Sequence, residues 1–206
     1  MNRGTGTASV ASPVVPFAVV EELAGHVLRR PPSVGITRLV AVDGRSGSGK
    51  TTLARHLAAQ LQAPLIHLDD LYEGWQGLAG VGSLLHGWIA EPLAQGRPAR
   101  WRPYDWATGT RDDWREVPAS SVVVLEGCGS GSEPLTDHLS LLIWVESDDD
   151  ARRERLRGRS DWDSYRQHHF ADWARQEETL LGRENTPGRA DVVVLNDIAP
   201  PRLIVT

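Results

Sequence analysis

Lysine, cysteine and long apolar runs are scarce in this chain. Of its 22 basic residues, Lys50 is the single lysine and the others are arginines. The single cysteine, Cys128, excludes an internal disulfide. No run approaches the roughly 20 apolar residues of a membrane span, and a formal net charge of −5 argues against general nucleic-acid binding. We therefore expect neither a membrane nor a nucleic acid as partner, and the 206 residues suit one domain with a full core.

The single lysine lies in a glycine-rich segment with a defined spacing. Residues 44–52 read Gly-Arg-Ser-Gly-Ser-Gly-Lys-Thr-Thr, which matches the phosphate-binding pattern G-x-x-x-x-G-K-[ST]. An apolar run over 38–43 predicts a buried strand before it, and Leu53, Leu57 and Leu61 have helical spacing after it. Strand, glycine loop and helix is the order that the motif requires. The segment therefore predicts a phosphate-binding loop.

The chemistry of this motif assigns a role to each residue type. Glycines let the backbone approach an anion closely, and the N–H groups at the start of the helix face it. A slim ammonium, Lys50, fits between phosphates where a planar guanidinium would need a differently shaped loop. Thr51 is expected to offer its hydroxyl to Mg²⁺. The predicted nucleotide-binding residues of the loop are Gly44, Ser46, Gly47, Ser48, Gly49, Lys50, Thr51 and Thr52.

Strand and helix patterns alternate along the rest of the chain. Strands that are apolar throughout and alternate with helices indicate an α/β fold with a parallel sheet covered on both faces. Residues 97–118 have little periodicity and are long for a structureless connection, which indicates a functional role. We predict a disordered tail over 1–15 and one domain over 16–206. The expected strands are 38–43, 64–68, 121–125, 139–145 and 191–195, and the expected helices are 17–30, 51–61, 83–95, 148–157 and 160–182.

Three of the expected strands end in residues suited to chemistry. Ligands of open parallel sheets bind at the carboxyl ends of the strands, so Gly44, Asp69 and Glu126 should meet at one crevice. Glu126 is placed to hold a water of Mg²⁺, which takes few direct protein ligands. Asp69 is placed to accept the proton of an acceptor hydroxyl. Asp69 and Lys50 are therefore the candidate catalytic residues, with Thr51 and Glu126 as the candidate metal site.

A run of arginines follows the strand at 139–145. Residues 151–159 hold five arginines, and a charge run of this kind is commonly a solvated helix face. Positive charge directly after a core strand also suits a lid that closes over phosphates and excludes water. We favour a lid at about 148–160, with Arg155 and Arg157 as candidate nucleotide-binding residues.

Five sets of residues form an ordered series: the loop at 44–52, Asp-Asp-Leu-Tyr at 69–72, Glu-Pro-Leu-Ala-Gln-Gly-Arg at 91–97 with Arg-Pro-Tyr-Asp-Trp at 102–106, Val-Leu-Glu-Gly at 124–127 and Arg-Gly-Arg at 157–159. Taken in this order, they resemble the uridine kinase and phosphoribulokinase group of P-loop kinases. The resemblance covers roughly residues 38–195. It implies a three-layer P-loop NTPase fold, with a five-stranded parallel sheet flanked by helices and an arginine-rich lid.

The resemblance also implies roles for individual residues. Asp69 would be the base, and ATP and Mg²⁺ would be the cofactors. Gly109 stands where uridine kinases commonly have a histidine, so the acceptor can also be another nucleoside, a nucleotide or another small alcohol. Tyr104 and Trp106 can alternatively belong to a loop packed on the core. The residues expected to line the acceptor pocket are Tyr72, Tyr104, Asp105, Arg111 and Arg159.

The leading hypothesis is an ATP- and Mg²⁺-dependent kinase that phosphorylates a hydroxyl of a small molecule, with a nucleoside as the favoured acceptor. A nucleoside monophosphate kinase is the alternative within enzymes, and Arg97, Arg100, Arg102 and Arg111 are its candidate clamps for an acceptor phosphate. A nucleotide-binding regulatory or motor module is the alternative from another class, although the Asn-Lys-x-Asp element of guanine-specific switch proteins is absent. Use of ATP implies a cytoplasmic location, and a homo-oligomer is left open.

Overall fold

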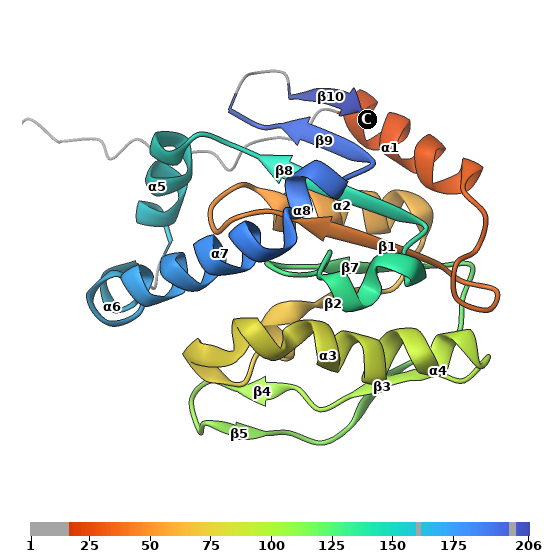
Figure 1. Ribbon diagram of the computed structural model, residues 1–206, viewed down its shortest axis with the longest axis horizontal. Helices are drawn as coiled ribbons and strands as arrows, with labels where there is room; N and C mark the ends of the chain where they lie inside the picture. The colour runs from red at the N-terminus through yellow and green to blue at the C-terminus, as the bar shows by residue number, and fades with distance from the viewer. Residues whose placement is uncertain (1–16, 160–161, 198–200) are drawn as a thin grey trace, which may run out of the picture.

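The structure, a computed structural model, describes residues 17–159, 162–197 and 201–206 (Figure 1). The tail expected over 1–15 and the first two residues of the helix expected over 160–182 lie outside the described residues. Helices lie on both faces of a central sheet, so the predicted α/β class is confirmed. Within the described ranges, no helix is long and apolar enough to span a membrane.

In the described residues the central sheet has six strands, five of them parallel. The sixth, β10, pairs antiparallel with β9 at the edge of the sheet. The resemblance implied only the five parallel strands. β10 was not predicted because it is short and largely exposed, and so carries no run of buried apolar residues. Across the sheet the strands are β10 (Arg202–Val205), β9 (Val192–Leu195), β8 (Leu141–Glu146), β1 (Arg38–Asp43), β7 (Val122–Glu126) and β2 (Leu65–His67).

Successive residues of the buried strands face two separate cores. In β1, Val40 and Val42 pack with the helices α1 (Phe17–Arg29) and α2 (Lys50–Leu61) on one face. Leu39 points to the other face, where it joins the core formed with the helical segment at 81–94. Successive side chains of a strand point to opposite faces, so a strand that is apolar throughout must be covered on both. This is why β1 lies at the centre of the sheet.

The second face is covered by two expected helices that the structure divides. The helix expected at 83–95 is present as α3 (Val81–Leu85), the π-helical turn η3 (His86–Ala90) and α4 (Glu91–Ala94). The helix expected at 160–182 is divided at His169 into α6 (Trp162–His168) and α7 (Phe170–Glu184). His169 has non-helical backbone angles, and its ring stacks on Trp75 at 4.1 Å between centroids. A tertiary contact therefore accompanies the break.

Residues 97–118, which lack periodicity, form two small antiparallel sheets (Figure 1). The strand β3 (Ala99–Trp101) pairs with β6 (Arg115–Val117), and β4 (Tyr104–Asp105) pairs with β5 (Thr110–Arg111). Strands of two or three residues are too short to show alternation, which is why the sequence pattern did not predict them. The remaining described elements are η1 (Leu68–Asp70), η2 (Gly74–Gly80), η4 (Glu133–His138), α5 (Asp149–Arg157) and α8 (Thr186–Arg189).

Candidate active site

Three neighbouring strands, β1, β7 and β2, end beside one another. In the parallel register, Glu126 at the end of β7 pairs with Val42 of β1 and with His67 of β2. The phosphate loop follows β1 directly, and Asp69 follows β2 by two residues. Lys50, Thr51, Asp69 and Glu126 consequently line one cavity of about 840 Å³. The structure thus brings the predicted catalytic and metal-site residues together at the carboxyl edge of the sheet, as the position rule for parallel sheets requires.

The glycines of the loop adopt backbone angles that other residues rarely take. Gly47 has φ +80° and Gly49 has φ +94°. A Cβ on Gly47 would lie 2.6 Å from the carbonyl oxygen of Arg152, and one on Gly49 would lie 2.3 Å from Nδ2 of Asn196. Side chains at either position would therefore strain the backbone; one at Gly47 would also push against the backbone of α5 (Asp149–Arg157), and one at Gly49 would displace the Asn196 side chain. Gly49 leads into α2, so the N–H groups at the start of that helix are available to an anion.

Three side chains hold the carbonyl groups of the loop. Arg152 donates to the carbonyl oxygen of Ser46 at 2.8 Å, and Asn196 donates to that of Ser48 at 2.7 Å. Arg155 donates to the carbonyl oxygen of Gly47 at 3.2 Å. The C=O and N–H of a trans peptide point in opposite directions, so carbonyls fixed in this way turn the next N–H groups the other way. The N–H of Ser48 itself donates to the carbonyl oxygen of Arg45 at 3.1 Å, so the N–H groups of Gly47 and Gly49, which follow the other two held carbonyls, are the ones that suit an anion.

Lys50 is buried at the end of this loop, with 8% of its surface exposed. Burial by itself disfavours the ammonium. Nearby acidic groups, including Glu126, Glu177 and Asp69, more than offset that effect and hold the pKa of Lys50 above its ordinary value. The side chain is therefore charged at neutral pH. Its Nζ donates to the carbonyl oxygen of Arg45 at 3.4 Å, a long bond that a phosphate oxygen can replace.

Glu126 has a partner on each carboxylate oxygen. Thr51 Oγ1 donates to Oε1 at 2.8 Å, and His67 Nδ1 lies 2.6 Å from Oε2. Although burial opposes its charge, the hydrogen bond with His67 and the charge of Lys50 hold the pKa of Glu126 below its usual range. The hydrogen bond to Glu126 raises the pKa of His67. The sequence analysis missed His67, which is the last residue of β2 and lies opposite Glu126 in the register of the sheet.

The Thr51–Glu126 pair fits a magnesium site of the kind expected. A hydroxyl and an ionised carboxylate are hard oxygen ligands, and Mg²⁺ usually keeps several waters and takes one or two carboxylates. Among the described residues, no group of three or more His, Cys, Asp and Glu side chains is arranged to hold a metal ion. A magnesium ion here would therefore depend on these two residues, its waters and the phosphates of a bound nucleotide.

Asp69 lines the same cavity as the phosphate loop and is exposed there. Protein atoms around its carboxyl group raise its pKa, while Lys50 and Arg159 act in the opposite direction. A carboxylate with a raised pKa is a better proton acceptor than a fully solvated one. The backbone at Asp69 is fixed from the other side, because Trp106 Nε1 donates to its carbonyl oxygen at 3.0 Å.

The arginines of the predicted lid differ in what they contact. Arg155 lines the cavity, but its guanidinium donates to Ser147 Oγ at 2.7 Å and to the carbonyl oxygens of Gly47 and Asn196. Arg157 is exposed and is not among the described residues that line the cavity. Arg159 lines the cavity, with its guanidinium 5.7 Å from the centre of the Tyr165 ring. The geometry gives Arg155 a bracing role, and nucleotide binding by Arg155 and Arg157 stays a prediction.

The residues expected in the acceptor pocket are only partly brought together. Tyr72 lines the cavity with its ring, and its hydroxyl donates to the carbonyl oxygen of Cys128 at 2.8 Å. Tyr104, Asp105 and Arg111 are not among the described residues that line the cavity. Of the five residues expected there, Tyr72 and Arg159 are the ones at the cavity.

Asp105 and Arg111 instead hold the β4–β5 hairpin. Asp105 accepts a hydrogen bond from the backbone N–H of Ala107 at 2.8 Å, and this bond keeps the pKa of its carboxyl group below the ordinary value. Arg111 donates to the carbonyl oxygens of Arg102 and Leu71. Both side chains are thus used by the local fold, and their expected role in acceptor binding has no support in this geometry.

Five aromatic side chains form one wall of the cavity. We call this set the aromatic wall: Tyr72, Trp75, Trp106, Tyr165 and Trp173. Within it, the Trp75 ring lies 4.7 Å from that of Trp106 and 5.4 Å from that of Tyr165, measured between centroids. Of these residues, sequence analysis assigned only Tyr72 to the acceptor pocket. Trp75 lies in a glycine-rich stretch without periodicity, so no sequence signal placed it there.

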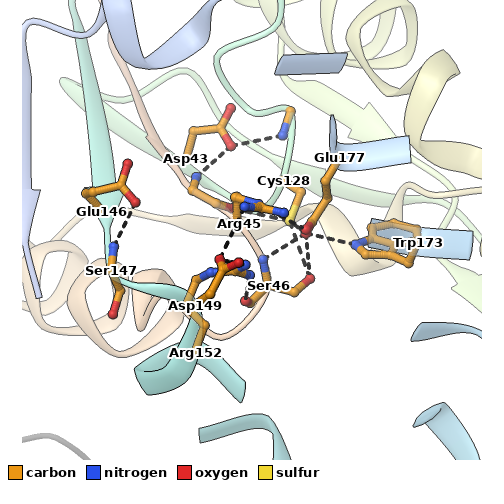
Figure 2. Close-up of polar contacts among 12 residues, drawn as sticks. Asp43, Arg45, Ser46, Cys128, Glu146, Ser147, Asp149, Arg152, Trp173 and Glu177 are labelled. Carbon is orange, nitrogen blue, oxygen red and sulfur yellow. Dashed lines mark hydrogen bonds and ion pairs between the residues drawn. The ribbon is translucent and has the colours of Figure 1, made fainter. Parts of the chain in front are cut away.

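Two further buried carboxylates lie beside the phosphate loop (Figure 2). Asp43 accepts hydrogen bonds from the backbone N–H groups of Gly44, Gly129 and Gly131 at 2.7, 3.0 and 2.8 Å. Burial raises the pKa of Asp43 to about 6, even though these bonds oppose the shift. Glu177 on α7 accepts a hydrogen bond from the backbone N–H of Ser46 at 2.7 Å. Neither residue was predicted, because each acts on a loop through contacts that only the folded chain creates.

The fold agrees with that of solved structures described as kinases. The chain has the fold of the P-loop kinases. It is similar to a structure described as a possible uridine kinase from Bacillus stearothermophilus, at 20% identity and a TM-score of 0.61, covering 84% of this chain and 96% of that one. It is also similar to a protein provisionally described as a fructose transport system kinase from Silicibacter sp. TM1040, at 22% identity and a TM-score of 0.54, covering 83% and 94%. No family model and no curated protein matches the sequence.

Proposed function

We propose that this protein is an ATP- and Mg²⁺-dependent kinase that transfers a phosphoryl group to a hydroxyl of a nucleoside. The observation that carries the proposal is the shared cavity of Lys50, Thr51, Glu126 and Asp69. Phosphoryl transfer needs a phosphate cradle, a metal site and a group that deprotonates or orients the acceptor. Each of these three parts has a candidate in the same cavity.

Each residue of the cavity would have its own role in phosphoryl transfer. The N–H groups of the loop and the ammonium of Lys50 hold the phosphate oxygens and balance their charge. Thr51 and Glu126 hold Mg²⁺, which when bound neutralises charge on the phosphates. Asp69 takes the proton of the acceptor hydroxyl, and Trp106 keeps the backbone at Asp69 in place.

The aromatic wall supports a nucleoside as the acceptor. Bases stack on aromatic side chains, and each such stack contributes about 1–3 kcal/mol. Trp75 and Trp106 line the same cavity as Asp69, so a base held by this wall would be near the carboxylate. The similar structure described as a possible uridine kinase points in the same direction.

The arginines that a nucleoside monophosphate kinase would use are already engaged. Arg102 donates to the carbonyl oxygens of Asp112 and Arg111, and Arg97 donates to the side chain of Gln95. Arg100 lies 3.6 Å from Glu116 on the surface. These contacts favour an acceptor without a phosphate group over the nucleotide alternative.

An acceptor scan tests the proposal. Release of ADP from ATP and Mg²⁺ would be measured with each nucleoside, each nucleoside monophosphate, a set of sugars and no acceptor. We expect ADP release to depend on a nucleoside and to stop when Mg²⁺ is chelated. Turnover with monophosphates alone would favour the alternative enzyme. Nucleotide binding without turnover of any acceptor would favour a regulatory module and contradict the proposal.

A further inference from the structure

Glu177 places a carboxylate against the phosphate loop from the helix α7. Its side chain is 4% exposed, and it reaches the loop from the middle of α7. The oxygen Oε1 accepts from the backbone N–H and the hydroxyl of Ser46, each at 2.7 Å (Figure 2). The same oxygen accepts from Trp173 Nε1 and from Cys128 Sγ, each at 3.1 Å. One atom thus joins the loop, the segment after β7 and the aromatic wall.

A buried acid beside a phosphate site has a cost that a purely structural residue would avoid. Burying a carboxylate is unfavourable unless it is paired or fully hydrogen-bonded. The nearest guanidinium, that of Arg45, lies 3.9 Å from Oε2 and is further than a direct hydrogen bond. The negative charge also opposes an incoming polyphosphate. An apolar residue would avoid the cost of the charge but would leave the donors of Ser46 and Trp173 without an acceptor, so the carboxylate is retained for its hydrogen bonds.

The hydrogen bonds of Glu177 act where the loop has most conformational freedom. Ser46 lies between Gly44 and Gly47, both with φ in the region that favours glycine. With its N–H and its hydroxyl both donated to one oxygen, Ser46 cannot rotate independently of α7. The bond from Trp173 fixes the indole at the other end, where its ring meets that of Tyr72 edge-on at 4.9 Å. The loop and the aromatic wall are therefore set by the same side chain.

We propose that Glu177 is a positioning residue that orders the first half of the phosphate loop through Ser46 and the aromatic wall through Trp173. The consequence for catalysis rests on the proposed function. The effect of Glu177 on the loop does not depend on which acceptor the protein uses. Glu177 acts through Ser46 and Trp173 and takes no part in the proposed proton transfer.

Two variants at position 177 and a neighbouring control test the inference. Glu177→Ala removes the acceptor, Glu177→Gln keeps an oxygen that can accept from Ser46, and Glu178→Gln changes an exposed acid on the same helix. Calorimetry would give the Kd of ADP with Mg²⁺, and hydrogen exchange without nucleotide would follow the backbone over 44–49. We expect Glu177→Ala to weaken ADP binding about tenfold or more and to speed exchange, because it leaves buried donors unpaired. Glu177→Gln should restore most of both, and Glu178→Gln should match the wild type.

Wild-type ADP affinity and exchange in a folded Glu177→Ala variant would overturn the inference. If that variant does not fold, as judged by circular dichroism, Ser46→Ala removes the hydroxyl bond alone and Trp173→Phe removes the indole bond alone. Faster exchange over 44–49 in Ser46→Ala supports the proposal, and unchanged exchange there in a folded Ser46→Ala variant overturns it. Absence of turnover with every acceptor would contradict the proposed function, whereas the exchange results would still decide the role of Glu177.

Discussion

The phosphate loop and the β4–β5 hairpin differ in how well the sequence predicted which of their residues line the cavity. Loop residues named from the motif, such as Lys50 and Thr51, line the cavity with Asp69 and Glu126. Hairpin residues named from the resemblance, Tyr104 and Asp105, do not line it, and Trp106 beside them does. In the loop, the glycines allow the backbone angles that turn N–H groups toward an anion, so the motif can be recognised from the sequence. In the hairpin, hydrogen bonds within the turn and to neighbouring strands occupy Asp105 and Arg111, so the sequence motif does not show which side chains reach the cavity.

The largest expected effect on turnover is at Asp69, which lines the cavity with the loop residues and accepts a hydrogen bond from Trp106 beside the hairpin. Asp69→Asn should lower kcat by about 10²–10⁴-fold, the range for loss of a general base, while the Kd of ADP stays near that of the wild type. Asp70→Asn is the matched control, because Asp70 pairs with Arg115 at 3.0 Å. Steady-state kinetics with the acceptor found in the scan would measure both. Near-normal turnover in Asp69→Asn would remove the base from the scheme.

Lys50 gives the next largest effect and tests the loop alone. Lys50→Met should lower kcat by about 10²–10³-fold, as expected when a preorganised charge at the transferred group is removed. Because the ammonium balances the charges of Glu126, Glu177 and Asp69, its loss should also lower the melting temperature modestly. Kinetics and thermal melting on the same preparation would check this. A large loss of stability would show that Lys50 serves the fold more than the phosphates.

The pH dependence of stability tests the role of Asp43, which accepts hydrogen bonds from backbone N–H groups beside the loop. Asp43 has its pKa raised from 3.8 to about 6 by burial, so the folded state holds its proton more tightly than the unfolded state does. Its contribution to the free energy of unfolding should therefore be greatest at low pH and should fall as the pH rises through that interval. Denaturant titrations between pH 4 and 7 would measure the slope, with Asp43→Asn as the comparison. A slope that is the same in both proteins would contradict the assignment.

The smallest effect is expected at Asp105 and sharpens the contrast between loop and hairpin. Asp105→Ala should lower the melting temperature slightly, because the N–H of Ala107 loses its acceptor, and should leave the KM for the acceptor close to that of the wild type. Trp106→Ala should raise the same KM, because this ring lines the cavity. If Asp105→Ala raised KM more than Trp106→Ala, the acceptor role expected from the resemblance would hold instead.

The sequence predicted most of the parallel sheet and the phosphate-binding part of the candidate site. Apolar runs mark β1, β7, β8 and β9 because each is buried on both faces, and the loop motif marks Lys50 and Thr51. The short strands at 99–117, the break at His169 and the edge strand β10 were not predicted. Each depends on partners distant in the chain, such as Trp75 for His169 and β9 for β10.

The amino-acid order alone indicated the phosphate loop, since glycines before a helix allow the positive φ angles and the close approach to an anion that such a loop needs. It also determined which strands are buried, because continuous apolar residues can be covered only from both sides. Tertiary structure alone decided that Glu177 meets Ser46 across 131 positions and that Trp75 joins Trp106 beside Asp69. Such contacts have no local signature, because their free energy is gained only when distant segments pack together.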